Sequence, residues 1–328
     1  MTEIVLPTAR EILRGRLFCP PPQKVPARYF LFAAHAEYLA ARYQPKVLLN
    51  DRNGSLYSPF LRLSLHRRGG LLVHLAHATT LERSFRLFMN DYDYYFLFGQ
   101  SSLEALRRKP VLFGRSRAVL AGSYKVDETY GLPLADAQRD VVLILGVGPD
   151  KEKKAGYQAS YRLLRDWLFA HPERRAIVKA HPRSDAPFWA EAEKTLAGVS
   201  LLPREVTLAS ALAQSGVVVN LMSNAVIEAA LARRPVMVVN LSGEADIFQQ
   251  ARFFGAEIRD METLEREFQR IQRDYSASLS RLEAFARFHL ETGIHGVRRI
   301  AELLECLLRG EDIPFQELSL PTAGIPRL

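Results

Sequence analysis

Hydrophobic and polar residues alternate along the chain in two successive blocks, and each block predicts strands interleaved with helices. In the first block, short apolar runs predict strands, and segments with helical spacing separate them. We expect strands at 46–50, 70–78, 93–99 and 117–127, and helices at 27–43, 58–69, 80–90 and 101–109. Residues 1–26 are rich in Pro and Arg, which predicts a short helix followed by an extended lead-in.

A polar segment with a proline, 131–140, predicts a linker, and a second alternation follows it. Its apolar runs predict strands at 140–148, 175–180, 199–203, 217–221 and 235–241. Helical spacing predicts helices at 156–172, 186–198, 207–216, 224–233, 261–275 and 277–309. The last stretch, 310–328, has three prolines and no clear period, so we expect a tail there.

Strands that alternate with helices in two blocks are typical of two Rossmann-like, doubly wound α/β domains that face a cleft. A chain of 328 residues also exceeds what one hydrophobic core usually organises. We expect the first domain at 1–132 and the second at 139–309, followed by the tail.

The composition predicts a soluble globular protein, with 48% hydrophobic residues and a mean hydropathy of −0.08. No apolar run reaches the ~20 residues that span a bilayer, and the N-terminus lacks the layout of a signal peptide. The two cysteines, Cys19 and Cys306, form no metal-binding spacing and no disulfide framework. These features together predict a cytoplasmic protein.

The formal net charge of +8 is concentrated in the first part of the chain. Residues 1–130 hold 19 Lys and Arg against 10 Asp and Glu, whereas residues 131–328 hold 25 against 26. A basic half attracts anions, so we expect an anionic acceptor or the inner membrane leaflet as its partner. Basic and aromatic residues do not interleave as in RNA-binding proteins, so no nucleic acid is expected.

Two His-Pro pairs occur ten residues apart, and their positions predict different roles. His171 falls at the end of a predicted helix, where a proline stops the helix and a histidine suits the negative end of its dipole. His181 directly follows a predicted strand, and ligands of open α/β sheets bind outside the carboxyl ends of strands. We therefore expect an anion site at the second pair, formed by Lys179, His181, Pro182 and Arg183.

The stretch VVVNLMSNAVIEAAL, from residue 217, gives a second signal. A strand ends near Leu221, Ser223 or Asn224 is predicted to cap a helix, and Glu228 lies about one turn into it. The helix N-terminus suits a phosphate, and Glu228 could accept hydrogen bonds from ribose or sugar hydroxyls. An ordinary capped helix with a solvated glutamate is the alternative, but a carboxylate among apolar residues needs a partner.

These motifs resemble the donor half of GT-B glycosyltransferases. The resemblance rests on His181-Pro182, on Ser223 with Glu228-Ala229, and on the Arg-Pro-Val run at 234–236. Bacterial capsule and lipopolysaccharide transferases are most similar, and Kdo, sialyl and CDP-glycerol-type transferases share parts of the pattern. In the first block, YDYYFLFGQSS and VLAGSYKVD are similar to segments of the same family. The resemblance covers most of residues 46–305.

The resemblance implies a nucleotide-activated donor, CMP- or CDP-linked, that binds the second domain without a metal or a cofactor. His181 and the helix from Asn224 would stabilise charge on the leaving phosphate. Gly146 and Gly148 would let the backbone approach the ligand closely. The implied activity is that of a metal-independent, inverting transferase. It would move a sugar or polyol phosphate to a polysaccharide or lipopolysaccharide acceptor.

A transferase of this kind needs a base that takes the proton from the acceptor hydroxyl. Asp51 and His77 both follow predicted strands of the first domain, and Asp51 is slightly favoured because a carboxylate among cationic groups stays ionised. The HAT at 77–79 departs from the His-Gly of many relatives, which weakens the case for His77. His74 lies within the strand and is expected in the core.

Asp91-Tyr92-Asp93 matches the Asp-x-Asp with which metal-dependent transferases hold a nucleotide. It precedes a predicted strand, at the amino end, so we interpret it as a helix-to-strand turn and expect no metal site. Two other functions stay open: a sugar-nucleotide epimerase or hydrolase of GT-B-like fold, and a non-catalytic protein that binds lipid or nucleic acid through its basic half.

Overall fold

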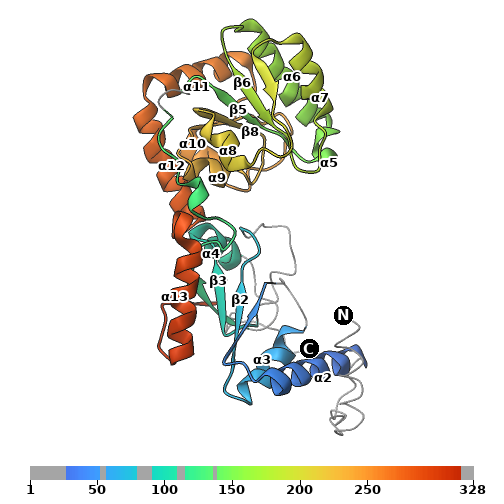
Figure 1. Cartoon of the computed structure of the whole chain (residues 1–328), viewed down its shortest axis with the longest axis vertical. Helices are drawn as coiled ribbons and strands as arrows, with labels where there is room; N and C mark the ends of the chain where they lie inside the picture. The colour runs from blue at the N-terminus through green and yellow to red at the C-terminus, as the bar shows by residue number, and fades with distance from the viewer. Residues whose placement is uncertain (1–26, 52–56, 80–90, 109–114, 136–138, 319–328) are drawn as a thin grey trace. The chain divides into compact units, whose positions relative to one another are not determined.

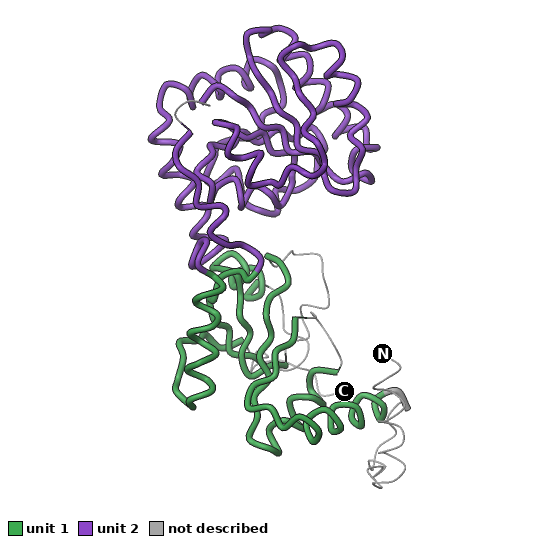
Figure 2. Tube along the Cα trace, in the orientation of Figure 1, with its two compact units in different colours: residues 1–124, 296–328 green, residues 125–295 purple. Residues whose placement is uncertain are grey.

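The chain folds into two compact units, each with a five-stranded sheet (Figures 1 and 2). The structure, a computed structural model, describes residues 27–51, 57–79, 91–108, 115–135 and 139–318. Unit 1 comprises residues 1–124 and 296–328, and unit 2 comprises residues 125–295 (Figure 2). The predicted segments 1–26 and 80–90 lie outside the described residues.

The sheet of unit 2 is parallel, with strand order β7-β6-β5-β8-β9. Its strands are β5 (Val142–Leu145), β6 (Ala176–Lys179), β7 (Val199–Leu201), β8 (Val217–Asn220) and β9 (Val236–Val238). The chain adds strands in one direction from β5 to β7, and β8 and β9 then lie on the other side of β5. This doubly wound order has its switch point between β5 and β8, and such a point leaves a crevice at the carboxyl ends of the strands.

Both faces of this sheet are buried, which explains its near-continuous apolar strands. Val142 and Ile144 of β5 share one hydrophobic core with Val217 and Val219 of β8, whereas the buried Leu143 points to the opposite face. The first face packs against α6 (Ala155–Ala170), α7 (Pro187–Thr195) and α11 (Met261–Arg273). The other side carries α8 (Leu208–Ala213), α9 (Val226–Leu231), α10 (Gln250–Phe254) and α12 (Tyr275–His289) (Figure 1).

The sheet of unit 1 has strand order β1-β2-β3-β4-β10. Four parallel strands follow chain order, and β10 pairs antiparallel with β4. The strands are β1 (Val47–Asn50), β2 (Leu71–Leu75), β3 (Tyr94–Leu97), β4 (Ser116–Leu120) and β10 (Gln316–Leu318). The described helices of this unit are α2 (Ala27–Tyr43), α3 (Ser58–His66), α4 (Gln100–Arg107) and α13 (Gly296–Arg309).

The C-terminal segment corrects three predictions. The single helix expected at 277–309 is interrupted after His289, where Gly293 adopts φ +54 and a short 3-10 turn precedes α13. Residues 296–309, expected in the second domain, instead cover the first sheet, because Ile300 and Leu303 pack against its strands. The expected tail also contains β10, so part of it belongs to the sheet of unit 1.

The first unit ends earlier than residue 132, because two arginines hold the segment after it on unit 2. The Arg234 side chain is 1% exposed and donates from its guanidinium to the Pro133 carbonyl at 2.9 Å. Arg233 donates to the carbonyl of Leu132. The first part of the expected linker is therefore packed on unit 2, and the second domain begins near residue 125.

Two short helices were not predicted from the sequence. They are α5 (Pro149–Glu152), directly after β5, and α10, which follows the loop after β9. Among the described helices, none is long and apolar enough to cross a membrane.

Candidate functional site

The turn after β6 fixes the protonation of His181. The backbone N–H of Arg183 donates to Nδ1 of His181 at 3.2 Å, and the N–H of Ser184 donates to the His181 carbonyl at 2.8 Å. Burial lowers the pKa of His181, and the Arg183 charge lowers it further. The ring is therefore neutral at neutral pH, and because Nδ1 accepts a hydrogen bond, the proton lies on Nε2. His181 thus presents an N–H donor.

Gly148 lies opposite this donor, at the end of β5. A Cβ added at Gly148 would lie 3.9 Å from His181 Nε2 and 3.7 Å from an Arg183 guanidinium nitrogen. At Gly146 a Cβ would lie 3.1 Å from the Lys179 carbonyl oxygen and 3.2 Å from the His181 backbone nitrogen. Gly146 therefore permits close approach of the backbones after β5 and β6, and His181, Arg183 and Gly148 meet at one place.

A buried carboxylate, which sequence reasoning missed, holds this turn in place. Glu152 of α5 is 8% exposed and accepts a hydrogen bond from the Ser184 hydroxyl at 2.5 Å. The Ser184 Oγ in turn accepts from the backbone of Ala186 at 2.9 Å. The carboxylate also lies close enough to raise the pKa of His181, against the larger effect of burial. In the sequence, the one feature that could have pointed to Glu152 is its position four residues after Gly148.

Lys179 was predicted to join the anion site, but its ammonium is engaged elsewhere. Its Nζ donates to the carbonyl of Arg204, after β7, at 3.1 Å. The Arg204 guanidinium in turn pairs with the exposed Asp185 at 2.7 Å. Of the four residues predicted for this anion site, the structure directs His181 and Arg183 toward Gly148, whereas Lys179, the last residue of β6, contacts the loop after β7.

The turn after β8 is held by buried amides. Met222 adopts φ +62, a left-handed conformation that is uncommon for a side chain of this size. The backbone N–H of Ser223 donates to Oδ1 of the buried Asn220 at 3.1 Å, and the amide of Asn220 donates to Gln250 at 2.7 Å. Asn220 is a polar residue at the end of a buried apolar strand, a signal that could have marked it in the sequence.

Neither Ser223 nor Asn224 is the N-cap of α9, which corrects the prediction. The helix begins at Val226 with Ala225 as its N-cap, because the carbonyls of Ser223 and Asn224 first accept turn hydrogen bonds from 226 and 227. The Ser223 Oγ accepts from the Ala225 N–H at 3.4 Å. Ser223 thus closes the turn that precedes the helix, while Asn224 is exposed.

Glu228 lies in the first turn of α9, as predicted. Burial raises its pKa, and no side-chain hydrogen bond or ion pair joins Glu228 to another of the residues that the structure describes. The negative charge of Glu228 also acts on Tyr130. Burial is the main cause that raises the pKa of the Tyr130 phenol to about 12, and Glu228 is the second. A half-buried carboxylate without a cationic partner is suited to accept hydrogen bonds from a ligand.

Lys151 of α5, which follows β5, contacts the loops after β8 and β9, on the other side of the switch point. Its Nζ lies 3.4 Å from the carbonyl oxygen of Met222, after β8, and 3.3 Å from the Glu244 carboxylate, after β9. Sequence reasoning missed both charged residues, because nothing in the spacing shows that these three loops meet. Neighbouring strands are ~4.8 Å apart, so the ends of β6 and β8 lie about 10 Å from each other along one edge.

The two candidate bases lie at one edge of the sheet of unit 1. Asp51 directly follows β1 and His77 follows β2, its parallel neighbour, and both residues are exposed. His74 is fully buried in β2, stacks on Tyr92 with ring centroids 4.3 Å apart, and has its pKa lowered by burial to about 4. The expectation that His74 belongs to the core is confirmed.

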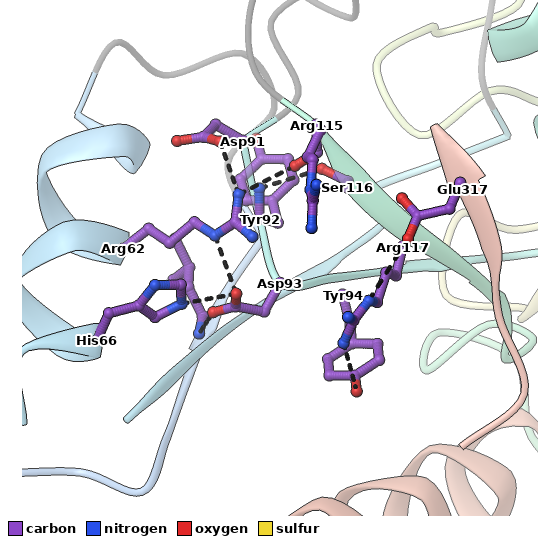
Figure 3. A network of polar contacts seen from close by, with 11 residues as sticks. Arg62, His66, Asp91, Tyr92, Asp93, Tyr94, Arg115, Ser116, Arg117 and Glu317 are labelled. Carbon is purple, nitrogen blue, oxygen red and sulfur yellow. Dashed lines mark hydrogen bonds and ion pairs between the residues drawn. The ribbon is translucent and has the colours of Figure 1, made fainter. Parts of the chain in front are cut away.

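The Asp-x-Asp sequence lies at the amino end of β3, as predicted, and its carboxylates bind protein groups (Figure 3). Arg62 of α3 donates to Asp91 at 2.8 Å and to Asp93 at 2.9 Å. Asp93 Oδ1 also lies 2.7 Å from His66, and its Oδ2 accepts from the backbone of Leu72 at 2.8 Å. Asp93 therefore ties α3 and β2 to β3. The helix expected before this turn, 80–90, is outside the described residues.

His171 is the C-cap of α6, as predicted. Its Nδ1 donates to the Trp167 carbonyl at 2.9 Å, and its Nε2 lies 3.5 Å from Glu265 of α11. The two His-Pro pairs thus occupy opposite ends of the parallel strands. Across the described ranges, no group of three or more His, Cys, Asp or Glu side chains could hold a metal ion.

No protein-family model matches the chain, and no curated protein matches its sequence. Solved structures do match its fold. S. aureus MnaA with UDP is 11% identical with a TM-score of 0.55, and the match covers 92% of this chain and 87% of that one. UDP-GlcNAc 2-epimerase from Neisseria meningitidis, bound to UDP-GlcNAc, is 12% identical with a TM-score of 0.53, over 88% and 84% of the two chains.

A transferase shares the same architecture. The pneumococcal O-GlcNAc transferase GtfA, in complex with UDP and GlcNAc, is 12% identical with a TM-score of 0.54, over 84% of this chain and 60% of that one. These similarities show a two-domain, Rossmann-like GT-B fold, as the sequence predicted. The fold hosts both transferases and epimerases, so the activity has to be argued from the site.

Proposed function

We propose that this protein is a nucleotide-sugar enzyme, specifically a metal-independent, inverting glycosyltransferase. Its donor is a nucleotide-activated sugar or polyol phosphate, CMP- or CDP-linked, and its acceptor is a cell-surface polysaccharide or lipopolysaccharide. The neighbours MnaA and GtfA were solved with UDP, which supports a nucleotide as the ligand of unit 2 and adds UDP to the donors to be tested.

The observation that carries the proposal is the convergence at the carboxyl edge of the second sheet. The Nε2–H of His181 and the guanidinium of Arg183 both approach Gly148, where a side chain would fill the space. A donor N–H and a cation at this place can stabilise the negative charge that develops on a leaving phosphate. Glu228, in the first turn of the helix that follows β8, would accept from ribose or sugar hydroxyls.

The remaining roles belong to unit 1. Asp51 or His77 would take the proton from the acceptor hydroxyl, and a base must come within hydrogen-bond reach of that proton. The basic residues of 1–130 would attract an anionic acceptor or the inner face of the membrane, which agrees with a cytoplasmic location. Metal independence is supported by Asp93, whose two carboxylate oxygens accept from protein donors.

A thermal-shift screen with CMP, CDP, UDP and GDP tests the proposal first. One of these nucleotides should raise the melting temperature, and His181→Ala should remove most of that shift. His171→Ala is the matched control, because it removes the other His-Pro imidazole at the opposite end of the sheet. Loss of the shift in both variants, or in neither, would argue against the proposed site.

The same protein can then be assayed with nucleotide sugars. A transferase consumes the donor only with an acceptor, whereas an epimerase or hydrolase converts the free donor without one. The fold matches to MnaA and the Neisseria enzyme make this epimerase the second candidate. A non-catalytic anion-binding protein would instead keep its binding in His181→Ala. A chelator should leave the activity unchanged. Loss of activity with a chelator would instead indicate that Asp91 and Asp93 hold a metal ion.

A further inference from the structure

Lys151 lies at the switch point, and both of its polar contacts there are long. Its Nζ is 3.4 Å from the carbonyl oxygen of Met222 and 3.3 Å from Oε2 of Glu244. Its side chain is 36% exposed, so a ligand in the crevice between β5 and β8 can reach the ammonium. Both contacts are longer than the 2.7–2.9 Å of a strong charge-assisted hydrogen bond.

Glu244 is held more tightly by two other groups. Its Oε1 accepts from Lys154 at 2.8 Å, and its Oε2 accepts from the Tyr157 hydroxyl at 2.8 Å. These contacts, chiefly the one with Lys154, lower the pKa of Glu244 to about 2. Glu244 therefore stays ionised, and its carboxylate is the negative charge that lies beside Lys151.

The two lysines differ in how easily they can leave this carboxylate. A pair of exposed charges contributes ~0–1 kcal/mol, so the longer contact of Lys151 is the easier one to exchange. A phosphate oxygen would offer Lys151 a short charge-assisted bond, while Lys154 and Tyr157 keep Glu244 in place. The loop that carries Glu244 has Gly243 at φ +70, and a Cβ added there would meet no atom within 4 Å.

We propose that Lys151 binds a phosphate of the ligand and that Glu244 is its internal competitor. In the ligand-free protein, Glu244 and the Met222 carbonyl share the Lys151 ammonium. When a phosphate enters, Lys151 turns to it and Glu244 stays with Lys154. This inference rests on the proposed function in one respect, that the ligand of the crevice carries phosphate.

The test is calorimetric titration of the full-length protein with inorganic diphosphate. Glu244→Gln removes the competing charge and should tighten binding about threefold to tenfold, the equivalent of about 1 kcal/mol. Glu262→Gln is the matched control, since Glu262 is an exposed residue of α11 whose pair is the neighbouring Arg266. It should leave the affinity unchanged.

Lys151→Met should weaken diphosphate binding about tenfold, and in that background Glu244→Gln should bring no gain. Equal or weaker binding by Glu244→Gln, with an unchanged melting temperature, would overturn the proposal and make Glu244 a residue that only positions Lys151. If Glu244→Gln does not fold, Lys151→Met decides alone, and an affinity equal to that of the wild type would overturn the proposal.

The outcome is separable from that of the proposed function. If a nucleotide binds through His181 but Glu244→Gln does not tighten diphosphate binding, the proposed role of Glu244 is wrong and the proposed nucleotide site is retained. If Glu244→Gln tightens diphosphate binding through Lys151 while no nucleotide binds, the role of Glu244 is retained and the proposed donor site is wrong.

Discussion

One backbone hydrogen bond determines what His181 can do. Because the Arg183 N–H occupies Nδ1, the neutral ring can only donate from Nε2, and Arg183 adds a positive charge nearby. A neutral donor beside a cation stabilises an oxyanion without taking part in proton transfer. The sequence placed His181 after a strand, and β6 ends two residues before it, but the hydrogen bond that fixes its tautomer is a property of the folded turn.

His181→Ala should lower the transfer rate by about one to three orders of magnitude, the effect of removing an oxyanion-stabilising donor. His181→Gln keeps an N–H donor and should retain part of the rate. Burial lowers the pKa of His181, so the ratio of wild-type to alanine rates should stay constant from neutral pH upward. Rate profiles of both variants measure this ratio. A ratio that falls as pH rises above neutrality would show that a protonated ring is needed.

Glu228→Gln should separate recognition of hydroxyls from recognition of phosphate. The wild-type carboxylate would accept from ligand hydroxyls, and hydrogen bonds to charged groups contribute ~1.5–3 kcal/mol. We therefore expect nucleotide binding to weaken about tenfold or more, and binding of inorganic diphosphate to stay the same. Calorimetry with both ligands measures the difference. Equal losses for the two ligands would mean that Glu228 supports the fold of α9 and does not contact the ligand.

Among the elements of unit 2, α6 and α11 are joined by a clamp of charged and aromatic groups. Arg174, before β6, is 8% exposed and makes a bidentate pair with Glu265 of α11. The Arg174 guanidinium also lies 4.6 Å from the centre of the Trp167 ring, and the Trp167 indole donates to Glu265 at 2.9 Å. The clamp fixes the amino end of β6, the strand that carries His181 at its other end.

This clamp predicts a pH dependence of stability. The Arg174 hydrogen bond, as the largest cause, lowers the pKa of Glu265 from 4.5 to about 2. A lowered carboxylate pKa contributes stability that is present above pH 4.5 and is lost as the pH falls toward 2. Glu265→Gln should lower the melting temperature at neutral pH and flatten its fall in this window.

Thermal melts at a series of pH values measure the slope of melting temperature against pH between 4.5 and 2. Glu244, whose pKa is also about 2, loses its charge in the same window, so the slope should decrease without vanishing. The exposed Glu283→Gln on α12 is the control and should leave the curve unchanged. An unaltered slope in Glu265→Gln would show that the clamp adds nothing to the free energy of unfolding.

Elements with long apolar runs were predictable, and short ones were not. VLIL and VVVN read as strands because both of their faces are buried. The four residues of α5 carry no period that could be recognised, although Lys151 and Glu152 both lie there. The contact between Lys151 and Glu244 could not be predicted either, because these residues meet only when β5 and β9 lie in one sheet.

At the scale of the whole molecule, the chain passes from unit 1 to unit 2 and returns. Apolar spacing alone placed 296–309 with the preceding helix, because a helical pattern does not show which sheet its apolar side covers. The structure assigns this helix, α13, to the first sheet. Unit 1 therefore depends on α13, which is distant in sequence from the other helices of the unit, to cover one face of its sheet.

Leu303→Ala tests this dependence. Leu303 of α13 is 2% exposed and belongs to the core that includes Val73 of β2, Phe96 of β3 and Val119 of β4. Removing a buried leucine side chain costs about 2–5 kcal/mol, and the loss should fall on unit 1 although the substitution lies near the C-terminus. Hydrogen exchange should therefore accelerate at the amides of β2, β3 and β4 and stay unchanged in β5 and β8.

The matched control is Leu308→Ala, because Leu308 lies on the same helix and is 47% exposed. Faster exchange in β5 or β8 would place α13 with the second sheet and restore the division predicted from sequence.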